Sequence, residues 1–182
     1  MENYRLVPHP AFPPDRVTGV AIQLWADPEP DELLLTFRVE GSEGLRLPDW
    51  ASPSRRDGLW ETTCFELFLQ LAGREEYFEF NLSPSTEWAA YRFSRYRDGM
   101  GALALAIDPN VERGAPSEDF IIEADVDLSG IPAGPLRIGL SAIIEETSGT
   151  KSYWALRHPP GDNPDFHHPD CFALELPPAK QP

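Results

Sequence analysis

The clearest pattern in the chain is the alternation of side chains in two neighbouring segments, 63–71 and 77–82. In each segment every second residue is large and apolar, which is the periodicity of a β-strand. A hairpin closed over residues 72–75 would pair these apolar positions with one another. The predicted pairs are Leu69 with Phe78, Leu67 with Phe80 and Phe65 with Leu82. A slip of one residue would bury the acids and expose the phenylalanines, so the pattern itself predicts this register.

The opposite face of the hairpin is predicted to be a floor of acidic and aromatic side chains. The same register places Glu66 opposite Asn81 and Phe68 opposite Glu79. These groups on neighbouring strands could line a polar ligand site. The alternative is a solvated sheet face, which is common in antiparallel sheets. Both interpretations stay open, although Cys64 and Phe68 are unusual on a face that meets only water.

Similar alternation recurs along the chain, and no segment shows a convincing helical period. Eleven strands are predicted, over residues 4–7, 17–25, 32–40, 63–71, 77–82, 87–93, 102–108, 119–128, 136–145, 151–156 and 172–176. Short strands separated by turn residues are typical of sandwiches and barrels. We therefore expect an all-β chain, an antiparallel β-sandwich of jelly-roll type with about 10 to 11 strands. No repeat or linker divides it, so residues 1–182 are predicted to form a single domain.

A long loop is predicted over residues 41–59, next to the central hairpin. A structureless loop of this length is uncommon unless it forms a lid or a rim. Trp50 and Trp60 bracket it. Each could lie under a flat ligand such as a sugar ring, or plug the end of the core.

Composition narrows the partners. The chain has 15 lysines and arginines against 30 aspartates and glutamates, a net charge of −15. This acidic balance argues against nucleic acid and anionic membranes, which bind clusters of basic residues, so a neutral small-molecule ligand is expected. The apolar runs are shorter than the roughly 18 residues of a membrane span, and the N-terminus does not resemble a signal peptide. We expect a cytoplasmic protein in which Cys64 and Cys171 are free thiols.

The C-terminal part concentrates His158, His167 and His168 near acids and Arg157. Imidazole and carboxylate groups could bind a metal ion. Because no strong ligand motif is present and prolines flank the histidines, hydrogen bonds that lock the loop are favoured, and no metal is expected. Trp154 and Arg157 are better ligand candidates, since an aromatic plane beside a guanidinium can recognise a sugar. Trp154 could instead belong to the core.

These residues resemble a known family. Thr-Cys-Phe-Glu-Leu-Phe-Leu (63–69), followed by Tyr-Phe-Glu-Phe-Asn-Leu-Ser-Pro (77–84), resembles the central strands of DOMON-like domains related to the family 9 carbohydrate-binding modules. Ser-Tyr-Trp-Ala-Leu (152–156) with Pro-Asp-Phe-His-His-Pro-Asp (164–170) resembles the end of such bacterial domains. The resemblance implies a non-catalytic sandwich with a ligand site on its concave face or rim. Its carbohydrate-binding members bind a sugar, and some other relatives bind haem.

The chain departs from this family at two points. The family often carries an aspartate three residues before the strand glutamate, where this chain has Thr63. Haem-binding relatives use an axial methionine or histidine; Met100 and His158 are present, but nothing in the sequence pairs them. We therefore favour a sugar over haem and expect no cofactor.

The predicted function is the non-catalytic binding of a saccharide or similar small polar ligand. The stacking platform would be Trp88 or Trp154. The hydrogen-bonding groups would be Glu66, Glu79, Asn81, Arg92 and Arg157.

The alternatives are a carbohydrate-active enzyme and a haem-binding DOMON-type domain. For the enzyme, Glu66 and Glu79 are diagonal neighbours about 7 to 8 Å apart, which suits an inverting carboxylate pair. It is less favoured because no feature of the sequence keeps one acid protonated and the other ionised. The oligomeric state is left open.

Overall fold

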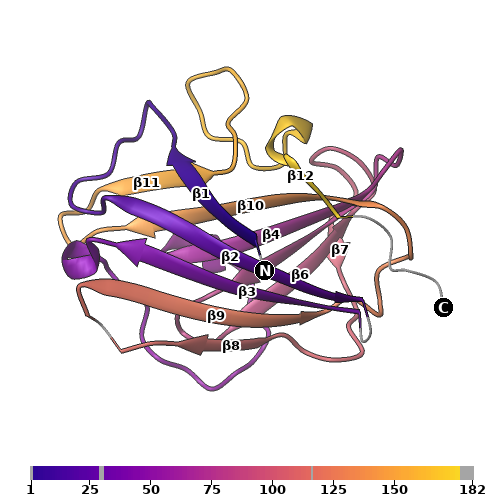
Figure 1. Ribbon diagram of the computed structural model, residues 1–182, viewed down its shortest axis with the longest axis horizontal. Helices are drawn as coiled ribbons and strands as arrows, with labels where there is room; N and C mark the ends of the chain where they lie inside the picture. The colour runs from indigo at the N-terminus through magenta and orange to yellow at the C-terminus, as the bar shows by residue number, and fades with distance from the viewer. Residues whose placement is uncertain (1, 29–30, 116, 177–182) are drawn as a thin grey trace.

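The chain folds into two facing β-sheets (Figure 1). The computed structural model describes residues 2–28, 31–115 and 117–176, and within them twelve strands, all paired antiparallel. The predicted all-β antiparallel sandwich is thus confirmed. No helix among the described residues is long and apolar enough to cross a membrane.

Each sheet mixes strands from distant parts of the chain. The first sheet has the spatial order β1 (Glu2–Pro8), β2 (Gly19–Pro28), β3 (Asp31–Glu40), β9 (Asp119–Asp127) and β8 (Asn110–Arg113). The second has the order β7 (Gly101–Ala102), β6 (Trp88–Phe93), β5 (Tyr77–Leu82), β4 (Cys64–Leu71), β10 (Leu136–Glu145) and β11 (Lys151–Ala155), while β12 (Leu174–Leu176) also pairs with β10. Strand β1 joins the two sheets, because its first part pairs with β2 and its end pairs with β11.

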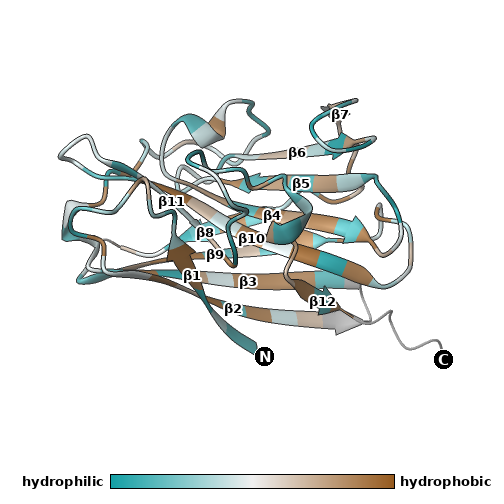
Figure 2. Ribbon diagram, turned by 90° about the horizontal axis from the view of Figure 1, so that it is seen from above, coloured by the Kyte–Doolittle hydropathy of each residue, from teal (hydrophilic) through white to brown (hydrophobic). Residues whose placement is uncertain are grey.

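The main core lies between the sheets and is built from the apolar half of each alternating pattern. Figure 2 shows these bands of hydrophobic and hydrophilic residues along the strands. Phe37 from β3 and Phe65 from β4 meet in the core with their ring centroids 4.8 Å apart. Burial of such apolar surface is the dominant favourable term in folding.

The register predicted for the central hairpin is confirmed. Strands β4 and β5 pair Leu69 with Phe78, Leu67 with Phe80 and Phe65 with Leu82. The prediction was wrong farther along the chain, where a strand was expected over residues 102–108 and a loop after it. The observed β7 ends at Ala102, Leu103 and Leu105 pack against the core from an irregular segment, and β8 lies within the expected loop. The apolar pattern of this segment is therefore explained by its contact with the core and not by strand pairing.

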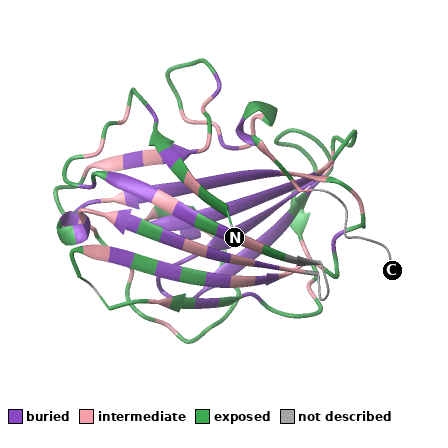
Figure 3. Cartoon of the chain, viewed as in Figure 1, coloured by how far each residue is buried: buried purple, intermediate pink, exposed green. Residues whose placement is uncertain are grey.

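The outer faces of the two sheets differ in burial (Figure 3). Strand β9 of the first sheet alternates between buried residues on the core side and exposed or partly exposed residues on the outer side. Strands β4 and β5 are buried on both sides along almost their whole length. The first sheet therefore has a solvent-facing surface, whereas the second has a covered one.

Candidate functional site

Three of the predicted ligand groups come together on the outer face of the second sheet. Glu66, Glu79 and Asn81 lie on β4 and β5, with Glu66 directly opposite Asn81 as predicted. The Ser141 hydroxyl on β10 donates to Glu66 over 2.8 Å, and the Asn81 amide donates to Glu79 over 2.9 Å. All of these side chains are buried; Glu66 is only 3% exposed. The face is thus neither the open site nor the solvated surface that the sequence left as alternatives.

Residues 157–172, which we call the cap segment, cover this face. Phe172 stacks on Phe68 with ring centroids 5.8 Å apart, and His167 contacts the same ring edge-on at 5.3 Å. Gly139 of β10 makes the close approach possible, because a Cβ there would lie 2.7 Å from the Phe172 ring. An ion pair between Arg97 and Asp165 also holds the segment down. Cys64 and Phe68, which are unusual on a wet surface, belong to an apolar cluster beneath the cap segment that is separate from the core between the sheets.

Burial has a strong effect on the two glutamates. Removal from water and, to a lesser extent, the neighbouring Glu79 raise the pKa of Glu66 to about 8. Burial also raises the pKa of Glu79 to about 7, against the opposing effects of its bond from Asn81 and of Arg97. The pair therefore holds at least one proton near neutral pH. Asn81 Oδ1 is buried with no hydrogen-bond partner, which adds to the cost of this arrangement.

His167 faces the acid pair from the cap segment. Its Nε2 lies 3.8 Å from Glu79 Oε2, and its Nδ1 lies 2.8 Å from the Tyr77 hydroxyl. That hydroxyl accepts a bond from the Arg97 backbone N–H, so its own proton is free to point at Nδ1. Burial, aided by Arg97, lowers the pKa of His167 to about 4, so the ring is neutral at neutral pH. These partners assign its proton to Nε2, facing Glu79.

The structure does not bring the remaining predicted ligand residues to this cluster. Trp88 and Trp154 were predicted as stacking platforms, and this prediction is wrong. Both are at most 5% exposed in the core between the sheets and offer no free ring face. Arg92 lies on the core side of β6, opposite Phe78, and extends into solvent to pair with Glu76. Arg157 is exposed just beyond β11.

The C-terminal histidines make the loop-locking hydrogen bonds that were predicted. His158 Nε2 lies 2.9 Å from the Val7 carbonyl oxygen, and His168 Nδ1 accepts from the Asp170 N–H. Among the described residues no group of three or more histidine, cysteine, aspartate or glutamate side chains is arranged to hold a metal ion.

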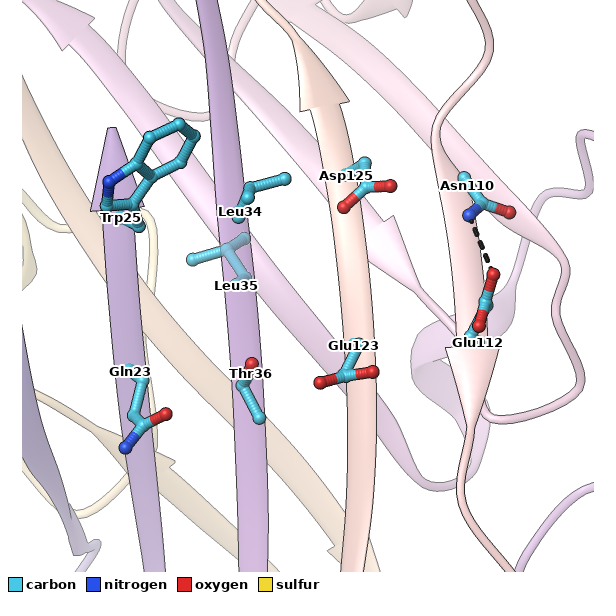
Figure 4. A pocket seen from close by; sticks show the side chains of 9 residues that line it. All are labelled: Gln23, Trp25, Leu34, Leu35, Thr36, Asn110, Glu112, Glu123 and Asp125. Carbon is cyan, nitrogen blue, oxygen red and sulfur yellow. Dashed lines mark hydrogen bonds between the residues drawn. The ribbon is translucent and has the colours of Figure 1, made fainter. Parts of the chain in front are cut away.

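An open trough of about 470 Å³ lies instead on the outer face of the first sheet (Figure 4). Its floor consists of two rows of side chains that run across β2, β3, β9 and β8. The upper row in the figure is Trp25, Leu34, Asp125 and Asn110, and the lower row is Gln23, Thr36, Glu123 and Glu112. The trough, which we call the Trp25 trough, thus combines an apolar end with several hydrogen-bonding groups.

The alternation of β2 creates this surface. Ile22 and Leu24 point into the core, so Gln23 and Trp25 point outward. The sequence analysis predicted the strand over residues 17–25 but no ligand site on its outer face. The available signal was a tryptophan on the polar face of a strand, where it remains partly exposed.

Comparisons with known proteins identify the fold. A solved structure described as "a putative carbohydrate-binding protein" from Bacteroides uniformis aligns with a TM-score of 0.64 and 14% sequence identity, over 93% of this chain and 83% of that one. A family 9 carbohydrate-binding module from Caldicellulosiruptor kristjanssonii, solved in complex with glucose, aligns with a TM-score of 0.45 and 15% identity, over 79% and 69% of the two chains. No family model and no curated protein matches the chain. At such identity the first match supports a shared β-sandwich fold.

Proposed function

We propose that the chain is a non-catalytic saccharide-binding domain and that its ligand lies in the Trp25 trough. The main observation in support of this proposal is that the partly exposed Trp25 lies next to a row of uncharged and acidic hydrogen-bonding groups. A sugar ring has apolar C–H faces and hydroxyl edges, and such a ligand suits an aromatic side chain bordered by polar ones. The description of the Bacteroides uniformis protein, which shares the fold, supports the same ligand class.

The binding of monosaccharides tests this proposal. Titration calorimetry with glucose, galactose and mannose should detect binding of at least one sugar. Trp25→Ala should raise its Kd about tenfold, the equivalent of about 1.4 kcal/mol. Trp50→Ala is the matched control, because Trp50 is 63% exposed on a different part of the surface and does not line the trough. Equal losses in both variants, or none in Trp25→Ala, would rule out this location.

The acid pair supports a second candidate, a carbohydrate-active enzyme. Raised pKa values at Glu66 and Glu79 are the kind of perturbation found at catalytic carboxylates. Both side chains lie beneath the cap segment, so a substrate could reach them only after that segment moves. The test is release of reducing sugar from oligosaccharides by the wild type and by Glu66→Gln. Turnover by the wild type that Glu66→Gln abolishes would favour the enzyme. If the wild type releases no reducing sugar, the enzyme hypothesis is excluded.

A further inference from the structure

We infer that the saccharide bound on the first sheet is an extended, neutral oligosaccharide that runs along the strands, beyond a single sugar ring. This inference rests on the proposed function and concerns the same sheet face. Its starting point is a second open trough of about 460 Å³, which we call the Arg38 trough. The two troughs share Gln23 and Thr36 in their lining, so they are continuous.

The strand register gives the direction and length of the combined groove. Trp25 pairs with Leu34, Gln23 pairs with Thr36, and Ala21 pairs with Arg38. Successive rows are two residues apart on each strand, and at about 3.4 Å per residue they are separated by about 7 Å. The row of Trp25 and the row of Arg38 are therefore about 14 Å apart along the strands. A single ring stacked on Trp25 would leave the Arg38 trough unfilled.

The far end of the groove is closed by an ion pair that crosses a strand. Arg5 on β1 donates to Glu40 on β3 over 2.7 Å, and both side chains pass above Gly19 of β2. Gly19 leaves the room for this crossing, because a Cβ there would collide with Glu40 Oε2. Ala21, in the next row, has a small side chain between Arg5 and Arg38. The pair thus forms a wall, and Ala21 keeps the floor in front of it low.

The charges along the groove indicate a neutral ligand. Glu112, Glu123 and Asp125 line the Trp25 trough and would repel an acidic saccharide. The two arginines of the Arg38 trough are already occupied, since Arg5 pairs with Glu40 and Arg38 with Asp119. The net charge of −15 adds a repulsive field. Uronic or sulfated chains are therefore disfavoured along the whole length of the groove.

The test compares ligand length in the wild type and in a blocked variant. Calorimetry is run with glucose, maltotriose, cellotriose, cellopentaose and trigalacturonate. We expect at least one neutral oligosaccharide to bind with a Kd at least ten times lower than that of glucose, and trigalacturonate to bind weakly or not at all. Ala21→Trp should fill the Arg38 trough and abolish this gain, so that the oligosaccharide binds no tighter than glucose does in the same variant. Ile121→Trp fills the same trough from β9 and provides a second variant should the first not fold.

Ala72→Trp is the control, because Ala72 is exposed in the turn between β4 and β5 and lines neither trough. Oligosaccharides that bind no tighter than glucose, or a gain that survives in both blocked variants, would overturn the inference and leave the proposed function in place. Tighter binding of trigalacturonate would overturn the charge argument. If no saccharide of any length binds the wild type, the proposed function itself fails.

Discussion

Glu66 and Glu123 hold equivalent places in the two sheets but have different surroundings. Each is a glutamate on the outer face of an interior strand, β4 in the second sheet and β9 in the first. Glu66 is buried beneath the cap segment and its pKa is strongly raised, whereas Glu123 is exposed in the Trp25 trough. The strands that carry the two glutamates occupy similar positions within their sheets. The difference therefore depends on whether a distant segment folds back over the face. It predicts that substitutions on the covered face of the second sheet reduce stability, whereas substitutions on the open face of the first sheet reduce binding.

The largest expected effect comes from truncating the covered face. Phe68→Ala removes a ring that is 1% exposed and packs on Phe172, so it should lower the free energy of unfolding by about 3 to 5 kcal/mol, as a core substitution does. Ile121→Ala is the counterpart on the first sheet, where Ile121 is 40% exposed, and it should cost under about 1 kcal/mol. Urea denaturation measures both. Similar losses for the two variants would contradict the assignment of one covered and one open face.

The next effect is a dependence of stability on pH. In the folded protein the pKa values of Glu66 and Glu79 are raised above the usual glutamate value of 4.5, so the folded protein binds more protons than the unfolded chain at intermediate pH. Their contribution is fully present below pH 4.5 and is lost as the pH rises through about 7 to 8. The free energy of unfolding should fall by about 2 kcal/mol or more from pH 5 to pH 8.

Glu66→Gln mimics the protonated form and should flatten this slope, while Glu43→Gln, at an exposed residue, should leave it unchanged. Denaturation curves collected across this pH range give both slopes. A wild-type stability that rises from pH 5 to pH 8, or a slope that Glu66→Gln leaves intact, would show that the buried pair does not titrate as described.

A smaller effect separates two glycines that each allow a close approach. In Gly139→Ala the new Cβ would meet the Phe172 ring at 2.7 Å in a packed cluster, and such overpacking should cost about 1 to 3 kcal/mol. In Gly19→Ala it would meet the flexible ends of Arg5 and Glu40, which can move, so the loss should stay within the roughly 1 kcal/mol of a surface ion pair. Thermal and urea unfolding distinguish the two cases. A larger loss for Gly19→Ala would reverse the comparison.

The smallest effect concerns one hydroxyl beneath the cap segment. Tyr77→Phe removes the bond to His167 and the acceptor for the Arg97 N–H, and should cost about 1 kcal/mol. The amides of the cap segment should also exchange faster with deuterium. Tyr4→Phe removes an exposed hydroxyl on β1 that bonds Glu2 and should change neither quantity measurably. Unchanged exchange in Tyr77→Phe would mean that this hydroxyl does not hold the cap.

The sequence allowed the sandwich and the hairpin register to be predicted because both follow from local alternation. The pairing of Leu67 with Phe80 requires that the residues on either side of them pair in the same register, and the structure shows that pairing. Glu66, Glu79 and Asn81 were correctly grouped for the same reason. Their burial could not be predicted, because it depends on Phe172 and His167, about 90 or more residues away in the chain.

The tryptophans show the limit of residue type as a guide to function. Trp88 and Trp154 were chosen for their chemistry, but they occupy core positions of their strands, whereas Trp25 occupies an outer position. Counting positions from Ile22 would have identified Trp25, since the two side chains must point to opposite faces of β2. The Arg38 trough depends on pairing among β1, β2, β3 and β9 and could not be read from any one of these strands.

The most direct test of the central claim, that ligand binds to the open face of the first sheet, is a map of amide shifts. ¹⁵N-labelled protein is titrated with the tightest-binding saccharide and followed by two-dimensional NMR. The account predicts that the perturbed amides cluster on β2, β3, β9 and β8 around Trp25, Thr36 and Glu123, while those of the cap segment stay fixed. Shifts confined to the region of Glu79, Asn81 and His167 would contradict it and return the ligand to the covered face.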